Sequence, residues 1–173
     1  LFIKKRVYRS IGQGILGFGL LFLGIAIMGS ELATLQDYPG ILDTLAKLGQ
    51  YRLLGVLAGM LFTGIIQSSS ATTAIVIVLT QQGMLDLNSA MALVLGSNIG
   101  TCVTALLASI GTSINARRAA VAHVLFNTIG AVIFIIALNP FIDLIQLLSS
   151  SVDRQVAWGH TLFNVINTLL FMP

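Results

Sequence analysis

A run of polar residues interrupts the most apolar part of the chain. Residues 67–73 read Gln-Ser-Ser-Ser-Ala-Thr-Thr, inside a stretch without any charge from Leu53 to Leu85. Amide and hydroxyl side chains both donate and accept hydrogen bonds, which suits them to hold an ion or a polar ligand. Polar groups in apolar surroundings must find partners. A cavity lined by these side chains would be a binding site.

The length of the uncharged stretch indicates that the chain turns at this polar run. One helix from Leu53 to Leu85 would be about 50 Å long, whereas the hydrocarbon core of a bilayer is about 30 Å thick. The part before Gln67 would reach only about 21 Å. We therefore expect a helical hairpin over residues 53–80 with its turn at membrane depth. Non-helical backbone is tolerated there only if it is buried in protein or lines a cavity.

A second polar interruption follows further along the chain. Residues 96–101 read Gly-Ser-Asn-Ile-Gly-Thr and lie between the apolar segments 90–95 and 103–108. This pattern predicts a broken helix over residues 88–110. Discontinuous membrane helices near the bilayer midplane direct positive N-terminal ends at anions and freed carbonyls at sodium.

The composition predicts an all-α integral membrane protein. Hydrophobic residues make up 56% of the chain and charged residues 9%, with a mean hydropathy of +0.96. Soluble domains are about one-quarter charged. We expect spanning helices at 11–29, 119–138 and 156–172, and interfacial helices at 31–49. The cations gather at segment ends, as in Arg117-Arg118, which fits the positive-inside rule and excludes a nucleic-acid surface.

Other side chains indicate packing, not catalysis. The apolar segments hold no Gly-x-x-x-x-Gly-Lys phosphate loop, no Gly-x-Ser-x-Gly elbow and no carboxylate pair, so we expect no enzyme and no catalytic residue. A short internal repeat places a histidine four residues before an asparagine twice, at His123 and Asn127 and at His160 and Asn164. We assign these four side chains to helix packing and expect no transition-metal site. We expect both asparagines to bond across helices. Because the chain begins without Met, we expect an excerpt of a longer polypeptide.

Taken in order, these motifs resemble the sodium/phosphate cotransporter family over nearly the whole chain. Members contain two such units as inverted repeats, and this chain resembles the second. The resemblance implies a secondary active transporter in the cell membrane that carries inorganic phosphate together with sodium and uses no cofactor. It also implies a second inverted repeat, in the same polypeptide or on a partner chain.

Carried over onto this chain, the resemblance implies two overlapping sets of ligands. The substrate set is Gln67, Ser68, Ser69, Ser70 and Thr72, and the sodium set is Gln67, Ser68, Asn98, Thr101 and Thr104. Phosphate would then be held by hydroxyls, backbone N–H groups and sodium, without any Lys or Arg. Two alternatives remain: a non-transporting membrane subunit whose polar interruptions serve packing, and an ion channel.

Overall fold

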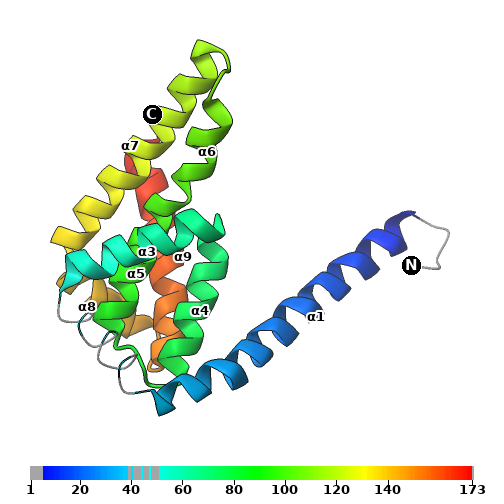
Figure 1. Ribbon diagram of the computed structural model, residues 1–173, viewed down its shortest axis with the longest axis vertical. Coiled ribbons are helices and arrows are strands. Elements are labelled where there is room, and N and C mark those ends of the chain that lie inside the picture. Colours follow the sequence, from blue (N-terminus) through cyan, green and yellow to red (C-terminus); the bar gives the residue numbers. More distant parts are fainter. Residues whose placement is uncertain (1–5, 39, 41–43, 45–46, 48–50, 173) are drawn as a thin grey trace.

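Helices make up the described part of this protein, and no strand occurs in it. The computed structural model describes residues 6–38, 40, 44, 47 and 51–172. The elements, shown in Figure 1, are α1 (Arg6–Ala33), the 3-10 turn η1 (Thr34–Asp37), α3 (Arg52–Ile66), α4 (Ser69–Gln81), α5 (Leu87–Gly100), α6 (Cys102–Ser109), α7 (Ile114–Ile136), α8 (Leu138–Leu148) and α9 (Val152–Phe171). The predicted all-α class is confirmed.

Helix α1 extends away from the other helices (Figure 1). It includes the predicted span 11–29, and its large apolar side chains are exposed along its length, from Val7 to Ile27. Its contact with the rest of the protein lies near its C-terminal end, where the Gln82 side chain donates a 3.3 Å hydrogen bond to the Gly29 carbonyl. The apolar surface of α1 is suited to lipid or to further transmembrane protein.

Three stretches of the described chain are long and apolar enough to cross a membrane, and they make this a membrane protein. They are residues 6–31 of α1, residues 87–109 over α5 and α6, and all of α7. Helix α7 contains residues 119–136 of the predicted span 119–138. Helix α9 occupies the predicted span 156–172 but is not among the three, because Asp153, Arg154 and several amide side chains lower its hydropathy.

Helix α5 forms the centre of the core. Every residue from Ala90 to Asn98 is buried, and α3, α4, α7, α8 and α9 all pack against this helix. Phe134 of α7 links two neighbouring helices through edge-on ring contacts. Its ring centroid lies 4.6 Å from that of Phe141 on α8 and 5.0 Å from that of Phe163 on α9. Helix α5, which includes Gly96 and Gly100, therefore contacts most of the other helices of the core.

The connecting segments differ in part from expectation. The predicted span 119–138 ends earlier, at Ile136 in α7, and α8 begins at Leu138 with Pro140 in its first turn, where the missing N–H costs no helical hydrogen bond. The buried face of α8 consists of Leu138, Phe141, Ile142 and Ile145. Of the predicted interfacial helices at 31–49, residues 31–33 form the end of α1 and Thr34–Asp37 form η1, while residues 39, 41–43, 45–46 and 48–49 lie outside the described residues.

Candidate functional site

The predicted turn lies between α3 and α4 and takes only two residues. Gln67 has left-handed backbone dihedrals, φ 61° and ψ 25°, and its N–H donates to the Thr63 carbonyl at 2.6 Å. Ser68 is extended, and its hydroxyl oxygen accepts a 3.2 Å hydrogen bond from the Ala71 N–H, which caps α4. A positive φ is uncommon for a residue with a side chain. Such conformations gather at functional sites, where the surrounding structure enforces them.

Ser69 and Ser70, the first two residues of α4, present unused hydrogen-bonding groups. Within the described residues, neither their hydroxyls nor their backbone N–H groups have a protein partner. Many other helical Ser and Thr hydroxyls donate to a carbonyl one turn back, as Thr80 and Ser109 do. The first turn of a helix lacks a preceding helical carbonyl and leaves its N–H groups free. This end of α4 is therefore a positive, donor-rich surface suited to an anion.

The turn residues differ in how accessible they are. Gln67 and Ser70 are exposed, whereas Ser68 and Ser69 are half-buried. The Ser68 hydroxyl already accepts the capping hydrogen bond, so it keeps its donor for a ligand. The structure thus brings the four predicted turn residues together, with the amide and the hydroxyls at one end of α4.

Thr72 connects the two helices that flank the turn. Its side chain is buried, and its hydroxyl lies 2.7 Å from the Thr63 hydroxyl of α3 and 3.2 Å from the Ser68 carbonyl. These contacts hold the end of α3 against the start of α4. The Thr72 hydroxyl thus braces the turn, and the predicted substrate contact of Thr72 stays a prediction.

The second motif interrupts its helix at a single residue. Gly96 to Gly100 remain inside α5, and the interruption is confined to Thr101, which keeps helical dihedrals and donates its N–H to the Ser97 carbonyl at 3.1 Å. The Ser97 hydroxyl and the Asn98 amide both donate to the Val94 carbonyl, at 2.7 and 2.8 Å. The helix predicted to be broken over 88–110 is thus interrupted at Thr101 alone, and the polar side chains before it are satisfied within α5.

The glycines of this motif serve close packing against α3. A Cβ on Gly96 would overlap the Val56 carbonyl, and a Cβ on Gly59 of α3 would overlap the Leu93 carbonyl. A Cβ on Gly100 would lie 2.8 Å from the Thr63 Cβ. Sequence reasoning missed this function, although a signal was present. Glycines four residues apart, as at 55 and 59 and at 96 and 100, are typical of membrane helices in close contact.

Because of this packing, the serine turn and the segment 96–101 both lie near the side chain of Thr63. Thr63 contacts Gly100 on one side and hydrogen-bonds to Thr72 on the other. Thr72, just after the serine turn, and Gly100 of the second motif therefore both contact Thr63 near the end of α3.

The three predicted sodium ligands on α5 and α6 differ in their surroundings. Asn98 is buried, and no described residue donates to its side-chain oxygen. The half-buried Thr101 donates its hydroxyl to the Ser97 carbonyl, which leaves its lone pairs available. Thr104 is exposed, and its hydroxyl has no hydrogen bond to the described part of the chain. Asn98 and Thr101 thus remain candidates, whereas no contact connects Thr104 to the turn.

The two His-Asn pairs share the same local hydrogen bond. The Asn127 amide donates to the His123 carbonyl at 3.0 Å, and the Asn164 amide donates to the His160 carbonyl at 2.8 Å. Asn127 also contacts the Cys102 thiol on α6. For Asn164 the expected bond across helices is wrong, because its amide is used one turn back on its own helix.

The bond between α7 and α9 comes from Asn167, which sequence reasoning did not single out. Its amide donates to the Phe126 carbonyl at 3.3 Å, and its side chain fills the space that Gly130 leaves open. The Asn167 side-chain oxygen and the Thr73 hydroxyl are the buried side-chain atoms left without a partner in the described residues. The hydrogen bond from Asn167 to α7 becomes evident only when the position of α7 relative to α9 is known.

Comparison with known proteins gives the family. Residues 37–152, well over half of the chain, match the family described as Na+/Pi-cotransporter. The "Uncharacterized protein YqeW" of Bacillus subtilis is 33% identical over 165 residues, which are 95% of this chain and 54% of that protein. The "Putative inorganic phosphate export protein YjbB" of Salmonella typhimurium is 27% identical over 174 residues, covering 99% of this chain and 32% of that protein.

A human relative shares a shorter region. The "Sodium-dependent phosphate transport protein 2C" of Homo sapiens is 42% identical over 102 residues, covering 57% of this chain and 16% of that protein. No solved structure shows a significant match. The chain spans about half of the length of YqeW and about a third of that of YjbB.

Proposed function

The chain belongs to the Na+/Pi-cotransporter family, and from this premise we propose that it forms one half of a sodium-coupled transporter of inorganic phosphate in the cell membrane. The family consists of transporters, which agrees with the expectation that the chain is not an enzyme. Among the relatives, one is named for sodium-dependent phosphate transport and another for phosphate export. We propose that a shared phosphate site serves both directions, with the gradients deciding which way phosphate moves.

The single observation that carries the proposal is the start of α4. Among the residues that the structure describes, the two hydroxyls and two backbone N–H groups of Ser69 and Ser70 have no protein partner, at the positive end of a helix. A phosphate ion accepts hydrogen bonds through all its oxygens and carries negative charge, so both properties of this surface favour it. The described turn places no Lys or Arg beside these groups, so a cation must offset part of the charge of the anion.

Sodium is that cation in our proposal. It is a hard ion that prefers oxygen ligands, and the region offers the Gln67 carbonyl, the Asn98 side-chain oxygen and the Thr101 hydroxyl. Because sodium would lie close to the phosphate, each ion would strengthen the binding of the other, which is the coupling that a symporter needs. We keep Ser68 as a shared ligand of both ions and Thr104 as an outer sodium ligand.

A second, inverted copy would complete the site. One helix end covers only one side of a phosphate ion, and leaving the other side against an apolar wall would cost several kcal/mol of desolvation. Alternating access also needs one repeat to move against another. We therefore propose that the active unit pairs this chain with a further repeat, from the same polypeptide or from a partner chain.

The two alternatives explain the turn less well. In a packing subunit the polar groups of the turn would be satisfied by neighbouring helices, as the hydroxyls of Thr63 and Thr72 are. Ser69 and Ser70 have no such partner in the described residues. A channel needs a continuous polar path along its helices. The polar groups here are gathered at one turn and one helix segment.

Ser69→Ala and Ser70→Ala in the full-length protein test the proposed phosphate site. A hydrogen bond to a charged partner contributes about 1.5–3 kcal/mol, so each change should raise the phosphate KM about tenfold or more. Ser109→Ala is the matched control, because its hydroxyl donates to its own helix at Leu106. Radiolabelled phosphate uptake into vesicles gives the KM. If both turn variants keep the phosphate KM of the parent, Ser69 and Ser70 do not bind phosphate.

Gln67→Leu tests the proposed sodium site. The side chain is exposed, so its replacement leaves the core intact. Phosphate uptake by this variant should need more sodium for half-maximal rate, while its phosphate KM at saturating sodium changes less. If the sodium dependence of uptake by this variant matches that of the parent, Gln67 is not a sodium ligand.

A further inference from the structure

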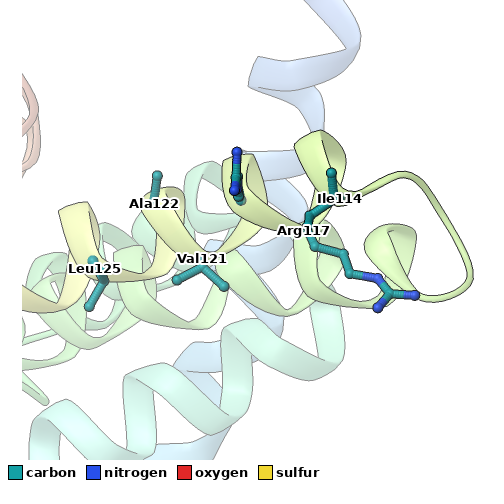
Figure 2. Close-up of a pocket in the computed structure, with 6 residues that line it drawn as sticks. Ile114, Arg117, Val121, Ala122 and Leu125 are labelled. Carbon is teal, nitrogen blue, oxygen red and sulfur yellow. The ribbon is translucent and has the colours of Figure 1, made fainter.

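One face of α7 carries an open groove with arginines at one end. It has a volume of about 360 Å³ and is shown in Figure 2. Its lining residues are Ile114, Arg117, Arg118, Val121, Ala122 and Leu125. Their spacing of three or four residues puts them on one side of the helix. The groove is therefore a stripe along α7, remote in sequence from the serine turn.

The two arginines at the groove are available to a ligand. Both side chains are exposed, and neither has a hydrogen bond or ion pair to any residue that the structure describes. By contrast, Arg52 donates to the Asn139 side chain at 2.5 Å and Arg154 to the Ser151 hydroxyl at 2.7 Å. Guanidinium groups match the geometry of phosphate oxygens, with which they form paired hydrogen bonds. Arg117 and Arg118 thus offer an uncompensated phosphate-binding pair.

Below the arginines the groove is apolar. Val121 is 53% exposed and Leu125 is 52% exposed, and Figure 2 shows Val121, Ala122 and Leu125 following one another along the helix away from Arg117. Exposed apolar side chains continue the surface at Ile129 and Val132. Since α7 is long and apolar enough to cross a membrane, the arginines at its start would lie at headgroup level, with the groove running into the hydrocarbon.

We propose that this groove binds an anionic phospholipid. Its phosphate would lie on Arg117 and Arg118, and one acyl chain would lie along Val121, Ala122 and Leu125. The groove runs about 10 Å from Arg118 to Leu125, enough for a substantial part of an acyl chain. An inorganic phosphate ion would use the arginines but gain nothing from the apolar lining. Basic residues beside a membrane helix attract anionic lipids. The proposal does not depend on the transport function.

Lipid selectivity of the full-length protein tests this site. The protein is reconstituted in phosphatidylcholine vesicles that carry a trace of spin-labelled phosphatidylglycerol or, in parallel, of spin-labelled phosphatidylcholine. The motionally restricted fraction of each spectrum gives a relative association constant. The parent protein should prefer phosphatidylglycerol, and Arg117→Gln and Arg118→Gln should each reduce that preference about fivefold, which corresponds to about 1 kcal/mol per basic residue.

Two further variants distinguish a specific lipid site from a general attraction between positive charge and anionic lipid. Arg154→Gln removes an exposed cation elsewhere and should leave most of the preference intact. Ala122→Phe keeps every charge but fills the groove, and it should also reduce the preference. Equal association of both lipids with the parent, or an equal loss in Arg154→Gln, would overturn the proposal. Displacement of phosphatidylglycerol by inorganic phosphate, with no effect of Ala122→Phe, would also overturn it and would assign the arginines to the free anion.

Discussion

Replacing Gly96 by alanine should separate α3 from α5. An added Cβ would lie 2.8 Å from the Val56 carbonyl carbon and 2.9 Å from the Val56 Cα, and closer still to the carbonyl oxygen. These atoms are backbone and cannot rotate away. Since carbon atoms pack at about 3.5–4.0 Å, the helices must move apart by roughly 1 Å. Overpacking of this kind costs about 1–3 kcal/mol.

Gly64→Ala is the matched control on the facing helix. A Cβ there would lie 3.5 Å from the Val103 Cγ2, which is an ordinary contact. Both variants gain the same helix propensity, about 0.8–1 kcal/mol, so their difference isolates the packing cost. We expect Gly96→Ala to be about 1–3 kcal/mol less stable than Gly64→Ala.

Thermal unfolding of the full-length protein in detergent measures this difference. Gly96→Ala should have the lower midpoint. It should also transport phosphate more slowly, because the end of α3 positions the serine turn through Thr63. A midpoint for Gly96→Ala at or above that of Gly64→Ala would refute the close-packing role of this glycine.

Three other changes have defined outcomes. A double-mutant cycle of Thr63→Val and Thr72→Val should give a coupling of about 1 kcal/mol in unfolding, because the two hydroxyls bond each other; additive effects would show that they do not brace the turn. Thr73→Val should leave stability unchanged or raise it, since it removes a buried hydroxyl that has no partner in the described structure; a clear loss of stability would show that a partner exists. The 173-residue chain alone, crosslinked to confirm monomers at low protein-to-lipid ratio, should not accumulate phosphate under a sodium gradient, and accumulation would refute the paired site.

The sequence predicts the turn well because its signal is local. Hydroxyls and an amide between two apolar segments cannot continue one long membrane helix, so the chain turns at Gln67 and Ser68. The spanning helix α7 follows from composition in the same way. These features depend on the residues of one segment, and they need no knowledge of a facing helix.

The packing role of the second motif could not be predicted, for the opposite reason. A glycine in a membrane helix can permit either unwinding or close approach, and the residues around Gly96 are the same in both cases. The choice depends on Val56 and Gly59 of α3, whose position relative to α5 no single segment reveals. The roles of Thr72, Asn164 and Asn167 likewise depend on which side chain lies opposite. The sequence identifies such polar residues within an apolar segment, but their hydrogen-bond partners depend on the helix that packs against them.

Sodium dependence of phosphate flux is the most direct test of the proposed function. The full-length protein is reconstituted in vesicles, and phosphate movement is measured under a sodium gradient and under an equal potassium gradient, for the parent and for Ser70→Ala. The account predicts phosphate accumulation on the side to which sodium flows, no accumulation with potassium, and a loss in Ser70→Ala that added phosphate partly restores. Equal flux with both cations, or parent behaviour in the serine variant, would contradict it.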